Sequence, residues 1–144
     1  MQEPKADLRA MTDQEILNLL ESWGEKPFRA KQLSEWLWKK EAQSFSELTS
    51  LSKSLRSQLE AHTKLLFAAI ESSQISNDGT IKSIFILPDG NRVEGVLIPS
   101  PDRTRMTACI SSQVGCSLTC KFCATGYLKL KRNLYSYEIV DQVR

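Results

Sequence analysis

The sequence lacks several features that mark whole classes of protein. It has no run of about 18 apolar residues, which excludes a typical membrane-spanning helix. Its first residues, Met-Gln-Glu-Pro-Lys-Ala-Asp, lack the apolar core of a secretory signal peptide. Internal repeats and low-complexity segments are also absent. We therefore expect a cytoplasmic protein without a membrane partner.

Cysteine is missing from residues 1–108 and again from residues 124–144. All four cysteines lie in one short stretch, at Cys109, Cys116, Cys120 and Cys123. In a reducing compartment, cysteines clustered in this way favour metal or redox chemistry over structural disulfides.

The charge balance changes along the chain. The 144 residues, 41% of them hydrophobic, suffice for about one domain with a packed core. Residues 1–100 carry 12 Lys and Arg against 14 Asp and Glu, whereas residues 101–144 carry 7 against 3. The basic side chains near the cysteines are Arg103, Arg105, Lys121, Lys129, Lys131 and Arg132. A positive rim suits a polyanionic substrate, although charge alone favours the simpler interpretation of a solvated loop.

Residues 12–62 follow the helical period. Thr12 and Glu15 form a capping-box pair, and Gly24 ends the helix that they open. Pro27 suits the first turn of a second helix. Apolar side chains recur at helical spacing, and they are Ile16, Leu19, Leu20, Trp23, Phe28, Leu33, Trp36, Leu37, Leu55 and Leu59. A small helical bundle is expected.

A second capping-box pair, Ser44 and Glu47, opens a short turn in this bundle. The tryptophans at 23, 36 and 38 could pack in the core or stack on nucleic-acid bases. Packing is the better interpretation, and Trp38 lies off the main apolar stripe.

Residues 64–98 change to the period of strands. Three segments rich in Ile, Val, Leu and Phe are separated by Asn77-Asp78-Gly79 and by Pro88-Asp89-Gly90-Asn91. These turns predict an antiparallel sheet of about three strands. Glu94 lies in the third strand, and its spacing alone predicts an outward, solvated carboxylate.

A boundary follows at Pro99-Ser-Pro101-Asp, and then residues 106–111 predict a new strand. The cysteine loop comes next, and Ser136 is expected to cap a helix that carries Glu138 in its first turn. Strand, long loop and helix make one βα unit, whereas a parallel sheet requires several. The chain is therefore expected to be the front part of a larger protein.

The last three cysteines are spaced C-x3-C-x2-C, with aromatic Phe122 before the final one. Three thiolates can hold a four-iron cluster and leave one iron open for a substrate or cofactor. Two alternatives remain: a zinc site with Cys109 as the fourth ligand, and buried thiols without a ligand role. The spacing and the strand–loop–helix context favour the cluster.

This motif resembles that of the radical S-adenosylmethionine (SAM) superfamily. The stretches 109–116 and 120–126, together with Arg132-Asn133-Leu134 and Glu138-Ile139-Val140, resemble the RlmN/Cfr family of RNA methyltransferases. Phe28-Arg-Ala-Lys-Gln-Leu-Ser-Glu-Trp-Leu and Asp78-Gly-Thr-Ile-Lys resemble its accessory region. The resemblance covers roughly residues 12–144.

The resemblance implies an enzyme that methylates C2 of adenine in 23S rRNA and at position 37 of tRNA, while the C8-methylating relative is the closest alternative. A zinc module that binds RNA without catalysis is an alternative from another class. The implied cofactors are a [4Fe-4S] cluster on Cys116, Cys120 and Cys123, and SAM. The implied partners are both RNAs and an electron donor, and a monomer is expected.

The resemblance also implies roles for two other residues. Glu94 aligns with the carboxylate that accepts a proton from the target adenine carbon. Cys109 aligns with the cysteine that resolves a covalent RNA adduct by forming a transient disulfide. The family's methyl-carrying cysteine has no counterpart here, because no cysteine follows Cys123. We therefore expect no methyl transfer from these 144 residues alone.

The expected fold class is α+β, in three segments. Residues 1–63 form a helical accessory domain, and residues 64–101 form antiparallel β hairpins. Residues 102–144 begin the core, as the first βα unit of a partial (β/α)6 radical SAM barrel.

Overall fold

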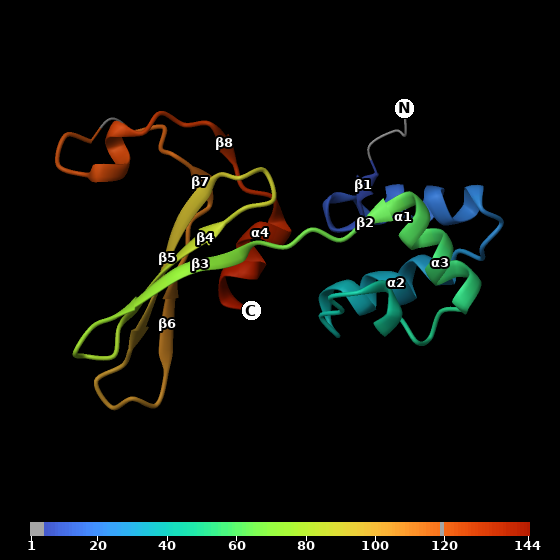
Figure 1. Ribbon diagram of the computed structural model, residues 1–144, viewed down its shortest axis with the longest axis horizontal. Helices are drawn as coiled ribbons and strands as arrows, with labels where there is room; N and C mark the ends of the chain where they lie inside the picture. Colours follow the sequence, from blue (N-terminus) through green and yellow to red (C-terminus); the bar gives the residue numbers. More distant parts are fainter. Residues whose placement is uncertain (1–4, 119) are drawn as a thin grey trace. The chain divides into compact units, whose positions relative to one another are not determined.

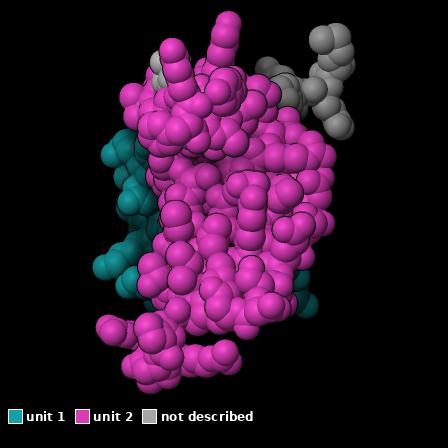
Figure 2. All heavy atoms as spheres, turned by 90° about the vertical axis from the view of Figure 1, so that its left-hand side faces the viewer, with its two compact units in different colours: residues 1–66 teal, residues 67–144 magenta. Residues whose placement is uncertain are grey.

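The computed structural model describes residues 5–118 and 120–144. The chain folds into two compact units, unit 1 (Met1–Leu66) and unit 2 (Phe67–Arg144), shown in different colours in Figure 2. The expected segments 64–101 and 102–144 thus lie almost entirely in one compact unit. None of the described helices combines the length and hydropathy that a bilayer-spanning segment requires.

Unit 1 is the expected helical bundle (Figure 1). Its elements are β1 (Ala6–Asp7), η1 (Leu8–Ala10), α1 (Asp13–Ser22), α2 (Phe28–Trp38), η2 (Phe45–Glu47), α3 (Lys53–His62) and β2 (Thr63–Lys64), where η marks a 3-10 helix. Leucines from α1, α2 and α3 dominate its core. The short strands β1 and β2 pair in parallel, which joins the two ends of the unit.

The predicted helix signals in unit 1 are mostly confirmed. Thr12 and Glu15 form both hydrogen bonds of the capping box, and Gly24 takes a φ of +77° just after α1. Trp23 and Trp36 pack against the core, as expected, whereas Trp38 is 38% exposed.

The second capping box is wrong. The Ser44 hydroxyl donates to the Glu47 carboxylate at 2.7 Å and does not accept from a backbone N–H group. The three-residue 3-10 helix η2 is too short to require that cap.

Unit 2 is built on one antiparallel sheet in the order β3–β4–β5–β6 (Figure 1). The strands are β3 (Ala69–Ile75), β4 (Ile81–Ile86), β5 (Arg92–Pro99) and β6 (Met106–Cys109). The two predicted hairpin turns are confirmed, with Gly79 and Gly90 at φ of +89° and +82°. The strand expected to begin a parallel barrel, β6, pairs antiparallel with β5 in this sheet.

The two faces of the sheet differ in burial. Phe85 and Val93 face a core that also contains Leu87, Val114 and Leu134. Because side chains alternate along a strand, the residues next to Phe85 and Val93 point to the opposite, open face of the sheet. Lys82, Glu94 and Cys109 lie on that exposed face.

The remainder of unit 2 follows β6. It consists of β7 (Gln113–Val114), η3 (Ala124–Tyr127), β8 (Arg132–Asn133), α4 (Ser136–Val140) and η4 (Asp141–Val143). Helix α4 begins one residue earlier than expected, because Tyr135 and not Ser136 is its N-cap residue. Glu138 is the N3 residue of α4, and its carboxylate accepts from the Tyr135 N–H at 2.8 Å.

Candidate active site

The cysteine loop is closed at its base by a short ladder. Gln113 pairs with Asn133 and Val114 with Arg132, so that β7 and β8 bring the two ends of the loop together. The Lys131 N–H donates to the Val114 carbonyl and the Cys116 N–H to the Leu128 carbonyl, at 2.9 and 3.1 Å. The ladder confines Cys116, Cys120 and Cys123 to one loop of unit 2.

Two glycines allow this loop to pack against itself. Gly115 has a φ of +77°, and a Cβ atom there would lie 2.2 Å from the Lys129 carbonyl oxygen. A Cβ atom on Gly126 would lie 2.5 Å from the Cys120 carbonyl oxygen. Both distances are far below van der Waals contact, so a larger residue would displace the backbone that carries the cysteines.

The thiols lie among backbone N–H donors. The Leu118 N–H donates to Cys116 Sγ at 3.3 Å. Hydrogen bonds from the backbone of Gly126, and then of Thr125, hold the pKa of the Cys123 thiol below its ordinary value, because they stabilise the thiolate. Thiolates with N–H donors are the ligands that iron–sulfur clusters use. The chemistry of this donor set therefore fits such a group.

A cavity of about 470 Å³ lies in this loop, lined by Cys116, Cys120, Gly126 and the chain from Tyr127 to Leu130. Cys123 does not line it. The loop thus brings two of the three expected ligands to one cavity. Among the described residues, no group of three His, Cys, Asp or Glu side chains converges as a metal site, and the four cysteines form no disulfide.

The basic residues near the cysteines divide into separate groups. Lys121 and Lys129 line the cavity. Phe122, between two of the cysteines, is 93% exposed. Lys131 and Arg132 point elsewhere, toward Asn91 and Asp89 of the turn between β4 and β5. Among these basic residues, Arg132 is paired with the carboxylates of Asp89 and Glu138, which lowers the net charge of the expected positive rim.

Glu94 and Cys109 lie on the same face of neighbouring strands. Val96 of β5 pairs with Cys109 of β6, so Glu94 is two residues along β5 from the partner of Cys109. The Ser111 hydroxyl donates to the Glu94 carbonyl at 2.8 Å. This bond keeps the chain beside β5 after β6 has ended. The predicted outward position of Glu94 is confirmed, and its carboxylate forms an ion pair with the Lys82 ammonium at 2.8 Å.

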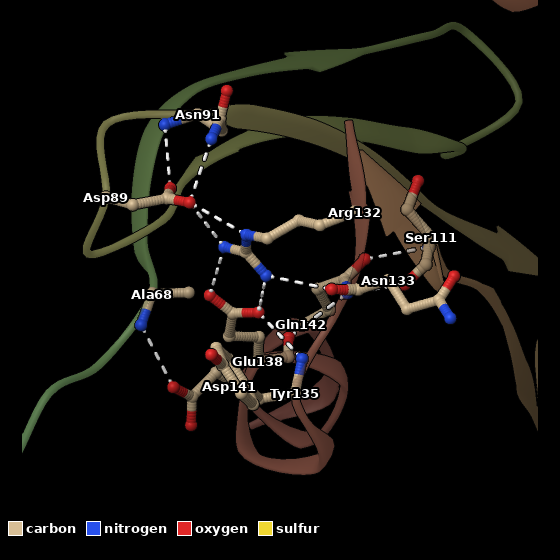
Figure 3. Close-up of polar contacts among 10 residues, drawn as sticks. All are labelled: Ala68, Asp89, Asn91, Ser111, Arg132, Asn133, Tyr135, Glu138, Asp141 and Gln142. Atoms are coloured by element: carbon tan, nitrogen blue, oxygen red, sulfur yellow. Dashed lines mark hydrogen bonds and ion pairs between the residues drawn. The ribbon is translucent and has the colours of Figure 1, made fainter. Parts of the chain in front are cut away.

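The sequence did not predict a partly buried ionic network that anchors the loop (Figure 3). Arg132 binds Glu138 through two bonds of 2.7 and 2.8 Å. It also reaches Asp89 at 2.7 Å. Glu138 is only 1% exposed, whereas the Arg132 side chain is 25% exposed, so the carboxylate is the partner shielded from water. The hydrogen bonds to Glu138 raise the pKa of Arg132 above its ordinary value.

Asp89 is ionised within this network. Partial burial favours the neutral form, but hydrogen bonds from Asn91 and Arg132 outweigh it and hold the pKa of Asp89 below its ordinary value. The network joins the turn between β4 and β5, strand β8 and helix α4 (Figure 3). It therefore fixes the end of the cysteine loop to the sheet.

Two further side chains attach η4 to the sheet. Gln142 accepts from the Ser111 N–H at 2.9 Å and donates to the Ser111 carbonyl at 2.8 Å (Figure 3). Asp141 accepts from the Ala68 N–H at 2.9 Å. Gln142 thus holds the backbone where β6 leaves the sheet. For this region, the sequence indicated only that Glu138 is an anionic residue in the first turn of a helix.

Comparison with known proteins agrees with these features. Residues 6–65 match the family model described as the ribosomal RNA large subunit methyltransferase N-terminal domain. A protein of Cytophaga hutchinsonii named "Probable dual-specificity RNA methyltransferase RlmN" is 55% identical over 139 residues, which are 96% of this chain and 38% of that protein. The "Dual-specificity RNA methyltransferase RlmN" of Geotalea uraniireducens is 48% identical over 139 residues, 96% of this chain and 40% of that protein.

A solved structure is also similar. The crystal structure of a radical SAM methyltransferase from Sphaerobacter thermophilus matches with a TM-score of 0.75 and 38% identity, over 97% of this chain and 40% of the other. The chain thus spans about two fifths of the length of the relatives it matches. These matches run through unit 1, the sheet and the cysteine loop alike, so nearly the whole chain is similar to part of the proteins named RlmN and to part of a radical SAM methyltransferase.

Proposed function

We propose that this chain contributes the accessory domain and the first part of the active site to an RNA methyltransferase that acts at C2 of adenine. The proposed substrates are 23S rRNA and adenine 37 of tRNA. In this proposal, β6, the cysteine loop and α4 form the first βα unit of a partial (β/α)6 barrel. The dual-specificity RNA methyltransferases among its relatives support the choice of substrates.

The observation that carries the proposal is the position of the cysteine loop. It follows directly from β6, the strand that places Cys109 beside the Glu94 face of β5. Strand β6 therefore connects a group held in that loop to the face of the sheet that carries the Glu94 carboxylate and the Cys109 thiol. That arrangement suits a reaction in which a substrate carbon loses a proton and a covalent adduct is then released.

Cys116, Cys120 and Cys123 would hold a [4Fe-4S] cluster, and the cluster with SAM would supply the radical chemistry. The backbone hydrogen bonds to Cys123 support this role, because they lower the pKa of its thiol and favour the thiolate form that binds iron. Gly115 and Gly126 would keep the loop compact around the group. Replacing any of the three cysteines by Ala should lower the iron content after anaerobic reconstitution.

Glu94 would accept the proton from the adenine carbon. The Cys109 thiolate would then attack the sulfur of the cysteine that links the RNA to the protein, so that a transient disulfide forms as the bond between that sulfur and the adenine-linked carbon breaks. Both side chains are exposed on one face of the sheet, where a base could approach them. A carboxylate in this position can act as a general base. Lys82 would orient it.

The first test analyses the nucleosides of RNA treated with the full-length protein. We expect 2-methyladenosine, and loss of this product in Glu94→Gln and Cys109→Ala. The appearance of 8-methyladenosine in its place would favour the C8-methylating relative. If neither product forms with a reconstituted cluster, an electron donor, SAM and RNA, the proposal fails.

The second test separates the cluster from a zinc site. Anaerobic reconstitution should give about four irons per chain, and Cys109→Ala should retain them, because Cys109 is not a ligand in the proposal. Stoichiometric zinc that is lost in Cys109→Ala would instead support a four-cysteine zinc module. We further infer a monomer in the reducing cytoplasm, where thiols persist and an electron donor is available.

A further inference from the structure

Strand β6 carries Cys109 at an edge of the sheet, where its own side chains give it no buried anchor. In the order β3–β4–β5–β6 it has one neighbour, β5, and the two strands share four residue pairs. Every residue from 106 to 110 is exposed. Cys109, paired with Val96, is the last residue of this ladder, and the ends of a ladder open most easily. The position of Cys109 therefore depends on what holds the chain directly after it.

Gln142 of η4 holds that chain at Ser111, two residues after Cys109 (Figure 3). The Ser111 N–H donates to Gln142 Oε1 at 2.9 Å, and Gln142 Nε2 donates to the Ser111 carbonyl at 2.8 Å. One side-chain amide thus pairs with the donor and the acceptor of one backbone residue, as a neighbouring strand would. The Ser111 hydroxyl donates to the Glu94 carbonyl. Ser111 is therefore fixed both to η4 and to β5.

The side chain of Gln142 fits this position as an amide. Nε2 also donates to the Glu138 carbonyl at 3.1 Å, so both of its hydrogens have acceptors while Oε1 faces an N–H group. Gln142 is 6% exposed, which keeps water from replacing these bonds. A carboxylate of the same size would face two carbonyl oxygens without a proton to donate.

Gln142 lies on the opposite side of the sheet from Glu94 and Cys109. Its Oε1 is 3.7 Å from the place that a Cβ atom on Gly95 would occupy, and Phe85 of the core is 3.0 Å from the same place. Gly95 therefore faces the core, whereas the neighbouring Glu94 points to the open face that also carries Cys109. Gln142 thus acts on Cys109 through the backbone and lies away from the substrate.

We propose that Gln142 is a positioning residue for Cys109 in the release of the methylated RNA. The inference rests on the proposed function and deepens it, because it takes Cys109 as the residue that resolves the adduct. By holding Ser111, Gln142 keeps the end of β6 closed and the Cys109 thiol on the face that carries Glu94.

The release step requires this placement. The Cys109 thiolate attacks the sulfur that links the protein to the RNA, and a disulfide bond forms. The electron pair of the broken sulfur–carbon bond stays with the carbon, which takes up one proton and becomes the methyl group. A dithiol reductant then restores the Cys109 thiol for the next turnover. The attacking sulfur must lie in line with the bond that breaks, so a small shift of β6 slows the step.

The experiment follows the covalent RNA–protein adduct on denaturing gels. It uses the full-length protein with a reconstituted cluster, SAM, an electron donor and a tRNA transcript. Gln142→Met keeps the size of the side chain and loses its three hydrogen bonds, so it should slow release about tenfold to a hundredfold and raise the share of RNA held as adduct. Gln142→Glu should act in the same way, because it lacks both donors. Iron content should stay at the wild-type level, since the ladder of β7 and β8 closes the cysteine loop separately.

Asp141→Ala is the matched control. Asp141 attaches the same element, η4, to the Ala68 N–H beside β3, at the other edge of the sheet. Its loss should lower the free energy of unfolding without raising the share of adduct, because a less stable protein loses product and adduct together. In the metal-free protein, hydrogen exchange at the Ser111 amide should become faster in Gln142→Met and not in Asp141→Ala.

Cys109→Ala is the reference, because it should hold nearly all of the reacted RNA as adduct. If Cys109→Ala accumulates adduct and Gln142→Met does not, Gln142 has no positioning role and the inference is wrong. If Gln142→Met does not fold, Gln142→Glu decides the same question. If Cys109→Ala accumulates no adduct, the proposed role of Cys109 fails, and the role of Gln142 fails with it.

Discussion

The Lys82 ammonium lies 2.8 Å from the Glu94 carboxylate, diagonally across β4 and β5. The side chains are 48% and 56% exposed, so the pair adds at most about 1 kcal/mol to stability. The main effect of this pair is on orientation, because the Lys82 ammonium sets the direction of the Glu94 carboxylate on the face of the sheet that also carries Cys109.

If Glu94 is the base of the proposed adenine methylation, Lys82→Met should lower its kcat about tenfold to a hundredfold, because Glu94 would lose its orientation. KM for RNA and the free energy of unfolding should stay close to the wild-type values. Lys82→Arg should restore most of the lost kcat. A Lys82→Met protein with the wild-type kcat would show that Glu94 needs no partner.

The buried Arg132–Glu138 pair should matter far more for stability. Arg132→Met leaves a carboxylate that is 1% exposed without its counter-charge, which costs about 3–5 kcal/mol. Arg92→Met is the matched control, since it breaks the exposed pair with Glu71 and should change the free energy of unfolding far less.

Urea unfolding can follow each unit by its own signal. The three tryptophans, at 23, 36 and 38, lie in unit 1, and the three tyrosines, at 127, 135 and 137, lie in unit 2. The tyrosine signal in near-ultraviolet circular dichroism should therefore report the stability that unit 2 loses in Arg132→Met. Equal effects of the two variants would contradict a buried role for Arg132.

Gly115 should be essential to the cysteine loop. Gly115→Ala adds both strain at positive φ and a contact of 2.2 Å with the Lys129 carbonyl, so the loop must open. Gly90→Ala has the same strain at φ of +82° but no atom within 4 Å of the new Cβ, and should cost only about 1–2 kcal/mol.

Iron content after anaerobic reconstitution measures the difference between the two glycine variants. We expect Gly115→Ala to lose most of the iron and Gly90→Ala to keep it. Full iron binding in Gly115→Ala would mean that the cluster does not need the compact loop.

The ionised Asp89 should make unit 2 sensitive to acid. Because its folded pKa is lowered, the stabilisation is complete above the ordinary value of 3.8 and is lost as the pH falls through the folded pKa. Asp89→Asn mimics the neutral form and should lower the free energy of unfolding at pH 6. The difference from the wild type should shrink below pH 3.8. A difference that is constant down to the lowest pH would exclude this linkage.

Features that depend on near neighbours in the chain were predictable. The capping box at Thr12 and Glu15, the end of α1 at Gly24, and the turns at Gly79 and Gly90 follow from short-range hydrogen bonds and from φ preferences. The predictions at Ser44 and Ser136 failed for different reasons. Ser44 does stand at the N-cap of η2, but its hydroxyl donates to the Glu47 side chain, whereas α4 begins one residue early, so that Tyr135 takes the place expected for Ser136.

The partner of β6 could not be predicted in the same way. A strand followed by a long loop and a helix fits a parallel sheet as well as an antiparallel one. The choice was made by the pairing of Val96 with Cys109, a contact between strands that the local pattern does not specify. The bond between Arg132 and Asp89 joins residues 43 positions apart, and the sequence showed only two unrelated charges there.

The local sequence specified the three cysteines at C-x3-C-x2-C spacing and the glycines and turn residues that shape the loop, because these depend on residues close together in the chain. The placement of Glu94, Lys82 and Cys109 on one face of the sheet became clear only in the tertiary structure. The same holds for the ion pair between Arg132 and Glu138. The physical reason is that strand register and burial are set by the core on the opposite face of the sheet. That core, around Phe85 and Val93, fixes which side chains of the neighbouring strands meet.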